Sequence, residues 1–243
     1  MNPEPGGPVT HLRYDGVAPP NLVAAVTLKS FHQRHGDSGL RPHLAQILDF
    51  PAVASVRQVH SADVVVARSA GQQSAADGLA TDQPGLLLTV VTADCLPLFL
   101  WSLDGACIAL LHAGWRGSAA GIARRGVELL VARFGADPGR LGALLGPSIC
   151  PACYEVGPEV AAAFHPEDSR PGRGDRRHLD LRAANRRRLL EAGVLEKNIV
   201  ADDLCTRCRS DLLCSYRAAG PDCGRLVAAL GLRRPSFFMG YTE

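Results

Sequence analysis

Residues 85–117 have the sequence GLLLTVVTADCLPLFLWSLDGACIALLHAGWRG, which predicts the centre of the fold. The length and apolar character of three runs within it favour buried strands, at residues 86–91, 96–101 and 107–111. The turn Thr92-Ala93-Asp94-Cys95 follows the first run, and the third run ends at His112, shortly before Arg116. The strands therefore lead to two short segments with an Asp, a Cys, a His and an Arg, which suggests a site.

The rest of the chain predicts one domain built around this stretch. With 243 residues, 47% of them hydrophobic, the chain can fill one substantial core. Further strands are expected at 22–29, 52–59, 62–67, 141–145, 198–201 and 226–232, and helices at 42–50, 118–134, 158–164 and 183–192. The order of strand, helix and strand over residues 107–145 indicates a crossover that covers one side of a sheet.

The expected fold class is α+β (mixed α/β), a single domain with mixed central β-sheets flanked by helices. The domain is assigned to residues 21–243, after a loose lead-in at residues 1–20 that is rich in Gly and Pro. Polar loops are expected after residue 30 and at 68–84, and residues 166–177, PEDSRPGRGDRR, have the composition of a disordered surface loop.

The charge pattern excludes several classes of partner. A net charge of +2, without a block of Lys or Arg, argues against nucleic acid and against anionic membrane surfaces. The N-terminus does not resemble a signal peptide, and the apolar runs are too short for a membrane helix. A soluble, cytoplasmic protein is expected, and both a monomer and a homodimer stay open.

Eight cysteines are spread through the chain, and four of them form two C-x-x-C pairs. The pairs are Cys150/Cys153 and Cys205/Cys208, and Cys205 lies 52 positions after Cys153. Ribbon-type zinc sites separate their pairs by roughly 15–20 residues. The spacing therefore favours scattered free thiols over a structural zinc site with four cysteines.

Three other side chains suggest a catalytic metal. His60, Cys95 and His112 offer two imidazoles and a thiolate, which suit zinc and leave a fourth position for water. However, 35 positions separate His60 from Cys95 and 17 separate Cys95 from His112, which matches no local zinc motif. From the residues alone, a hydrogen-bonded structural histidine and a core cysteine are the more common outcome.

A series of motifs then carries a resemblance to a known family. In chain order they are Gln58-Val59-His60, Ala76-Asp77-Gly78, Thr92-Ala93-Asp94-Cys95-Leu96-Pro97, His112-Ala113-Gly114-Trp115-Arg116-Gly117, Gly146-Pro147-Ser148-Ile149, Cys153-Tyr154-Glu155-Val156-Gly157, Leu179-Asp180-Leu181 with Asn185, Cys205-Thr206, Ser215-Tyr216-Arg217 and Gly224-Arg225. Together they resemble the YfiH family, also called multicopper polyphenol oxidase or laccase-domain proteins and, more recently, purine nucleoside phosphorylases. The resemblance runs from about residue 20 to the end of the chain.

The resemblance implies that His60, Cys95 and His112 bind Zn²⁺. Cu²⁺ is a second possible ion, because copper binds such a set of ligands more tightly than zinc does. It also implies phosphorolysis of adenosine, inosine, guanosine and methylthioadenosine, with adenosine deamination beside it. The chain departs from the family pattern at residues 35–39, at Ser61 and at Ala218. These departures concern substrate contacts more than the metal site.

Five further residues are given roles in this scheme. A catalytic zinc activates a water for attack on C6 of adenine, and Asp94, beside the ligand Cys95, is either the proton-transfer group or a carboxylate that orients a ligand. Asp77 is expected to form a turn. The planar guanidinium suits phosphate, so Arg116 is the first choice for phosphate binding, with Arg217 and Arg225 behind it.

Three alternatives stay open at the level of sequence. A polyphenol oxidase (laccase) needs a cluster of copper ions bound mainly by imidazoles, and the eight histidines include no His-x-His pair. A second alternative is an amide hydrolase that edits peptidoglycan precursors, with Cys95 as nucleophile and His112 as its base. The third is a module that binds metal or nucleosides without turnover.

Overall fold

The computed structural model describes residues 9–234, and two six-stranded sheets form its centre. In spatial order, the first sheet contains β1 (His11–Arg13), β2 (Leu22–Thr27), β15 (Leu226–Leu232), β7 (Leu86–Thr92), β3 (Ala52–Arg57) and β5 (Gly71–Ala75). The second contains β14 (Ile199–Ala201), β10 (Leu141–Leu145), β8 (Leu96–Ser102), β9 (Ile108–Ala113), β6 (Gly78–Thr81) and β4 (Val64–Val66). Both sheets are mixed, since each combines parallel and antiparallel pairs.

The main core lies between the two sheets, and side chains enter it at every second position. In β15, Leu226, Ala228 and Leu230 belong to this core, whereas Val227 and Ala229 belong to a separate cluster on the outer face. In β8, Phe99 and Trp101 face the other sheet, whereas Leu98 and Leu100 face outward. This alternation follows from the pleat of a strand. Because both faces are covered, the central strands are apolar throughout.

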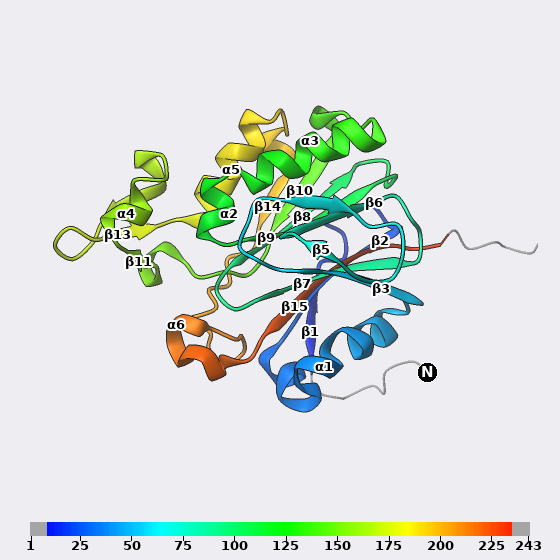
Figure 1. Ribbon diagram of the computed structural model, residues 1–243, viewed down its shortest axis with the longest axis horizontal. Helices are drawn as coiled ribbons and strands as arrows, with labels where there is room; N and C mark the ends of the chain where they lie inside the picture. Colours follow the sequence, from blue (N-terminus) through cyan, green and yellow to red (C-terminus); the bar gives the residue numbers. More distant parts are fainter. Residues whose placement is uncertain (1–8, 235–243) are drawn as a thin grey trace, which may run out of the picture.

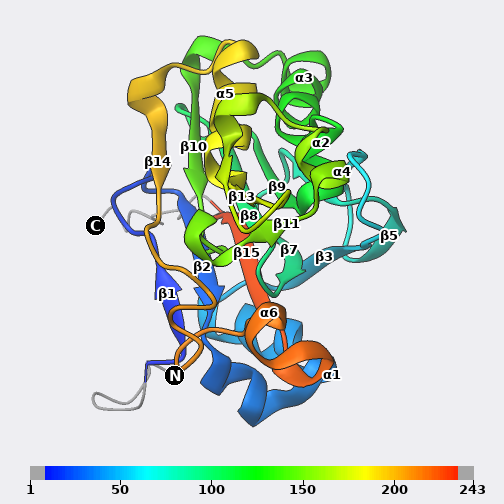
Figure 2. The ribbon, with the colours of Figure 1, turned by 90° about the vertical axis from the view of Figure 1, so that its left-hand side faces the viewer.

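Helices cover the two outer faces of the sheets, which gives four layers in the order helix, sheet, sheet, helix (Figure 2). Helix α1 (Lys29–Leu48) packs on the first sheet through Phe31, Leu40 and Leu44. Helix α3 (Ile122–Phe134) packs on the second sheet, and α5 (Leu181–Glu191) lies beside α3. Strands β9 and β10 both run antiparallel to β8, so the segment that includes α3 is the predicted crossover.

A smaller lobe extends from the second sheet, at the left in Figure 1. It contains β11 (Glu155–Val156), α4 (Pro158–Ala161), β12 (Ser169–Pro171) and β13 (Arg177–Leu179). In its core, Ile149 and Leu179 pack with Trp115 of α2 (Trp115–Ala119). The remaining short helix, α6 (Tyr216–Ala219), comes shortly before β15 in the chain. The single-turn 3-10 helices are η1 (Pro138–Arg140), η2 (Pro151–Cys153), η3 (Pro166–Asp168), η4 (Glu196–Asn198) and η5 (Gly220–Cys223).

The predicted fold class is confirmed, and the strands of residues 85–117 form as expected. Three local predictions are wrong. Residues 31–39 are helical rather than loop, with a bend at Gly36 (φ 62°), because Phe31 and Leu40 are buried against the sheet. Residues 68–84 include β5 and β6, and residues 166–177 include β12 and the start of β13. Backbone pairing with neighbouring strands orders these polar segments, and composition alone does not reveal it.

Two further expectations are only partly met. The helix expected from Ser118 is divided into α2 and α3, because Gly121 takes a left-handed conformation (φ 81°) between them. The loose lead-in at 1–20 includes β1, which pairs with β2, whereas residues 1–8 lie outside the described range, as do residues 235–243 of the predicted domain. Within residues 9–234, no helix has both the length and the apolar content needed to cross a membrane.

We expect Phe99→Ala to lower the free energy of unfolding by about 3–5 kcal/mol, because Phe99 is completely buried between the sheets. Leu103 lies nearby in the turn after β8 and is 43% exposed, so Leu103→Ala provides the control and should change stability by no more than about 0.5 kcal/mol. Urea unfolding measures both. Equal effects of the two substitutions would contradict the placement of the core.

Candidate metal centre and substrate cavity

His60 lies in the loop between β3 and β4, and its backbone has a conformation that residues other than glycine rarely adopt. Its φ is 59°, in the left-handed region. The backbone N–H groups on either side, at Val59 and Ser61, both donate to one oxygen of Asp77, at 3.1 and 2.6 Å. These two hydrogen bonds hold the loop in place, so the imidazole of His60 reaches the surface at a fixed point.

Cys95 lies where the chain passes from the first sheet to the second. Strand β7 ends at Thr92, and Cys95 precedes the first residue of β8. Asp94 lies in the turn between Thr92 and Cys95 and has a φ of 83°. Its carboxylate accepts hydrogen bonds from Thr206 Oγ1 (2.5 Å) and from the backbone N–H of Arg217 (2.7 Å). The carboxylate of Asp94 therefore ties this turn to two segments that are more than 100 residues further along the chain.

His112 belongs to β9 and is almost fully buried. Its Nδ1 lies 2.8 Å from the second oxygen of Asp77, which is itself completely buried. Asp77 thus holds His112 directly and His60 through the backbone of its loop. Asp77 lies in the bend between β5 and β6, as expected of a turn former, and the contact with His112 adds a second role. The signal available for it in the sequence is an acidic residue between Ala76 and Gly78-Leu79-Ala80, which indicates a buried carboxylate.

The structure brings His60, Cys95 and His112 together. One ligand atom from each lies within 4.8 Å of the other two, and the imidazole rings meet edge to face with centroids 5.1 Å apart. With Nδ1 of His112 bonded to Asp77, its Nε2 is the nitrogen available to a metal. Gly114 leaves space for an ion, since a Cβ there would lie 3.0 Å from the sulfur of Cys95. Two nitrogens and one sulfur at this separation fit a tetrahedral zinc with one open position.

The negative charges of Cys95 and Asp77 favour a cation at this centre. Burial disfavours the thiolate of Cys95, but hydrogen bonds with His112 and His60 outweigh it and lower its pKa to about 6. Burial likewise opposes the charged form of His112, yet its bonds to Asp77 and Cys95 raise its pKa to about 9. The pKa of Asp77 is lowered to about 2 despite burial, because His112 and two backbone N–H groups donate to it. The centre is therefore built to hold a positive charge beside a thiolate.

A cavity of about 610 Å³ opens beside these three residues. Its wall includes the aromatic residues Trp115, Tyr154 and Tyr216 and the basic residues Arg116, Arg217 and Arg225. The remaining lining residues are Gln58, Val91, Thr92, Ala93 and Asp94. The cavity thus combines aromatic surface, positive charge and the cluster of ligands, and it has the size of a small-molecule site.

Several neighbours fix the position of the cavity's arginines. The guanidinium of Arg116 lies 4.3 Å from the ring centre of Trp115, and that of Arg217 lies 5.3 Å from the ring centre of Tyr154. Arg217 also donates to the carbonyl of Glu155 (3.0 Å). Arg225 donates to the carbonyl of Gly224 (2.8 Å). All three arginines expected to bind phosphate therefore lie on one cavity, together with Asp94 and the three expected metal ligands.

Sequence reasoning did not assign roles to the aromatic residues of the wall. Tyr154 belongs to the quoted motif Cys153-Tyr154-Glu155, which was the signal available. Burial first, and then the nearby charge of Cys95, raise the pKa of Tyr154 to about 12. Its hydroxyl therefore stays protonated at neutral pH, so it can donate a hydrogen bond to a molecule in the cavity.

Comparison with known proteins shows which family this chain is similar to. A family model described as multi-copper polyphenol oxidoreductase laccase matches residues 38–233. Adenosine deaminase RL5, from an unknown prokaryotic organism, is 38% identical over 80% of this chain and 83% of its own length. Purine nucleoside phosphorylase from Deinococcus radiodurans is 40% identical, over 80% of this chain and 76% of its own. The crystal structure of Bacillus licheniformis YfiH is 25% identical and superposes with a TM-score of 0.85, covering 93% of this chain and 97% of that one.

The chain belongs to the YfiH family. This confirms the resemblance drawn from the motifs, and the family match extends over most of the predicted domain. The older description of the family, as multicopper oxidases, can be compared with the site. All eight histidines lie within residues 9–234, and in that range only His60 and His112 belong to a group of three or more ligands that could hold a metal. The described residues therefore offer one imidazole-containing centre rather than the copper cluster of a laccase.

We expect Asp77→Asn to weaken zinc binding by about 10–100-fold, because an amide cannot hold His112 and both N–H groups of the His60 loop as the carboxylate does. Competition with a chromophoric chelator measures the affinity. Asp63→Asn is the matched control, since Asp63 is an exposed aspartate near the same loop, paired with Arg125. If the two variants bound zinc equally well, Asp77 would not position the ligands.

Proposed function

We propose that this chain is a zinc-dependent purine nucleoside phosphorylase, acting on adenosine, inosine, guanosine and methylthioadenosine, with adenosine deaminase activity at the same site. The observation that carries the proposal is the cavity itself, in which three arginines and three aromatic rings surround the two histidines and the cysteine. Relatives named purine nucleoside phosphorylase and adenosine deaminase support the same two activities.

The arginines suit the phosphate that phosphorolysis consumes. The guanidinium forms paired hydrogen bonds with phosphate oxygens. Arg116 is the leading candidate, because it lies on the cavity next to the metal ligands and its guanidinium is already packed on Trp115. Arg217 and Arg225 add positive charge on the same cavity. Held there, the phosphate is positioned for attack on C1′ of the ribose as positive charge develops on the sugar.

The aromatic residues suit the purine base. Trp115, Tyr154 and Tyr216 present rings to the cavity, and a purine can stack on such a surface. The protonated hydroxyl of Tyr154 can donate to a ring nitrogen or to the departing base. Negative charge accumulates on the base as its bond to the ribose breaks, so a donor at this position lowers the barrier.

His60, Cys95 and His112 would hold the zinc, with His112 positioned by Asp77. In such a shell zinc is a Lewis acid that also lowers the pKa of a water ligand to about 7. Asp94 lines the cavity beside Cys95, and both of its oxygens already accept one hydrogen bond. Each carboxylate oxygen has a further lone pair, so Asp94 can both hold the turn and accept a proton during deamination.

A second function follows from one specific observation. The thiol of Cys95 has a lowered pKa and lies within 4.8 Å of a ring nitrogen of His60 and of His112, which is also the arrangement of a thiol hydrolase. Such an enzyme would use Cys95 as the nucleophile and His112 as the base, with an amide as substrate. It would retain activity after its metal is removed.

We expect a chelator to abolish both phosphorolysis and deamination, and added zinc to restore them. Cys95→Ala should lose both activities and one zinc per chain, because the substitution removes one of three protein ligands. Chromatography of adenosine incubated with and without phosphate measures adenine, inosine and hypoxanthine, and elemental analysis measures the metal. Amide hydrolysis that survives the chelator would instead support the thiol hydrolase, and copper in place of zinc would contradict the choice of metal.

We expect Arg116→Ala to lower kcat/KM for phosphorolysis by about 10²-fold, with a much smaller effect on deamination, which consumes no phosphate. Steady-state assays of the two reactions with adenosine measure this difference. Arg133→Ala, on the exposed face of α3, is the control for a lost surface charge. Equal losses in both reactions would show that Arg116 does not act on phosphate.

A further inference from the structure

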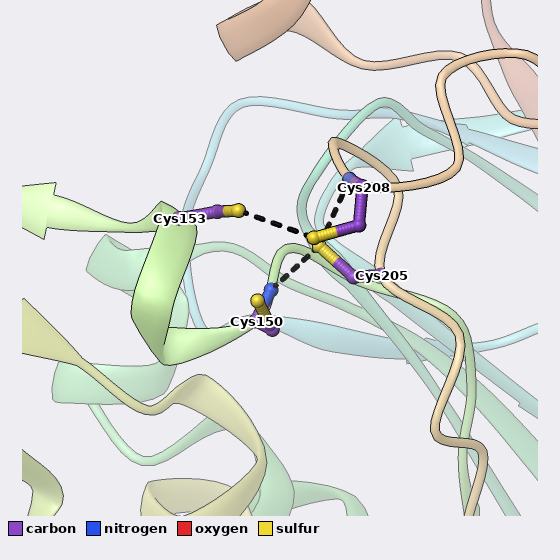
Figure 3. A group of neighbouring side chains, drawn as sticks. All are labelled: Cys150, Cys153, Cys205 and Cys208. Atoms are coloured by element: carbon purple, nitrogen blue, oxygen red, sulfur yellow. Dashed lines mark hydrogen bonds between the residues drawn. The ribbon is translucent and has the colours of Figure 1, made fainter.

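Four cysteines outside the candidate active site lie together. Cys150 and Cys153 belong to the turn that leads from β10 into the small lobe, and Cys205 and Cys208 belong to the turn after β14. Figure 3 shows the four side chains converging from these two segments. All four sulfurs lie within 4.8 Å of one another. The expectation from the sequence, of scattered thiols, is therefore wrong about their positions.

The distances fit a shared metal ion and not disulfide bonds. All four cysteines are free, and the sulfurs of Cys153 and Cys208 are 3.4 Å apart, whereas a disulfide joins its sulfurs at about 2.05 Å. Zinc binds thiolate sulfur at about 2.3 Å, so two sulfurs on a tetrahedral zinc lie about 3.8 Å apart. All separations in this cluster are within 4.8 Å, and the 3.4 Å between Cys153 and Cys208 is close to that value.

Backbone contacts around the cluster favour thiolate ligands. The N–H groups of Cys150 and Cys208 both point at the sulfur of Cys205, with N···S distances of 3.3 and 3.4 Å. Each C-x-x-C pair therefore contributes a backbone donor to the same buried sulfur. Donation of this kind stabilises negative charge on the sulfur, which is the form that binds zinc.

The two turns are also joined by contacts that do not involve sulfur. Ser148 and Cys205 form a parallel β-bridge, in which Ser148 N donates to Leu204 O (3.3 Å) and Thr206 N donates to Ser148 O (3.2 Å). Arg182 of α5 donates to the carbonyls of both Ser148 (3.1 Å) and Leu204 (2.6 Å). The protein backbone therefore holds the four sulfurs in position. The two pairs lie close together in space although 52 positions separate Cys153 from Cys205.

We propose that Cys150, Cys153, Cys205 and Cys208 bind a structural Zn²⁺ through four thiolates. Binding replaces the four thiol protons, which pass to solvent, and no oxidation is involved. Four protein ligands complete the tetrahedron, so no position stays open for water or substrate. This distinguishes the cluster from the centre of His60, Cys95 and His112, where three protein ligands leave one position open.

The cluster lies close enough to the cavity to support its wall. Thr206 follows Cys205 and donates to Asp94, and Tyr154 follows Cys153 and lines the cavity. A zinc ion here would tie the small lobe to the turn after β14, and through these neighbours it would fix one side of the cavity.

The test uses the full chain with Cys95→Ala, which disrupts the first centre, so that the remaining zinc reports on the four cysteines alone. We expect one zinc per chain and, in its X-ray absorption spectrum, four sulfur neighbours at about 2.3 Å. Adding Cys208→Ser should remove that zinc. Cys208 is exposed, so its loss leaves no cavity in the core. Adding Cys107→Ala instead is the control, because Cys107 belongs to neither cluster and the zinc should stay.

Stability provides an independent measurement. A strong chelator should lower the Tm of Cys95→Ala by about 5 °C or more, and should leave the Tm of Cys95→Ala with Cys208→Ser unchanged. Four results would each overturn the proposal: folded Cys95→Ala that carries no metal as purified, iron in place of zinc, fewer than four sulfur neighbours, and disulfides within the cluster in freshly prepared protein. These results do not depend on nucleoside turnover, so they are separate from the test of the proposed function.

Discussion

The packing of two apolar sheets against each other is the constraint on which the rest of this structure depends. The central strands bury side chains on both faces, so the chain must pass from one sheet to the other without leaving polar backbone groups unpaired inside. The passage from β7 to β8 uses the short turn that ends in Asp94 and Cys95. The carboxylate of Asp94 accepts two hydrogen bonds there, and the adjacent Cys95 lines the cavity. The same turn therefore connects the two sheets and places Cys95 in a group of residues that could hold a metal.

A second carboxylate does comparable work on the other side of the centre. Asp77 is completely buried, and each of its oxygens is used, one by the ring of His112 and the other by the loop that contains His60. Both histidines therefore depend on one residue that does not line the cavity. Breaking one of these contacts would disturb the other as well, since a buried carboxylate tolerates no unpaired oxygen.

Much of the fold could be predicted from the sequence where burial leaves a clear pattern. The strands of residues 85–117, the strand 141–145 and the final strand 226–232 are apolar because both of their faces are covered, and all of them form. Strand β5 and the small-lobe strands β11 and β12 were missed because their order comes from backbone pairing at an edge, which polar side chains do not disclose. Helix α1 was placed too late in the chain because only a few of its residues are buried.

The candidate site could be predicted only in part, for a similar reason. The residue types pointed to His60, Cys95 and His112, and the family motifs grouped them, but spacing along the chain gave no measure of distance in space. The same weakness led to the wrong preference for the four cysteines, because a gap of 52 positions is closed by a β-bridge between Ser148 and Cys205 that leaves no mark in the sequence. Family resemblance supplied what spacing lacked for the first cluster, and only the structure supplied it for the second.

The strands at the margins of the two sheets have a consequence for the behaviour of the molecule in concentrated solution. Strands β1, β14 and β4 contain three residues each, and β5, the longest at five, is rich in exposed glutamine and serine. An approaching polypeptide finds few unpaired amides in a row along such margins, and little apolar surface next to them on β5. These edges therefore oppose the addition of further strands to either sheet. They also oppose the edge-to-edge association of copies that leads to fibrous aggregates.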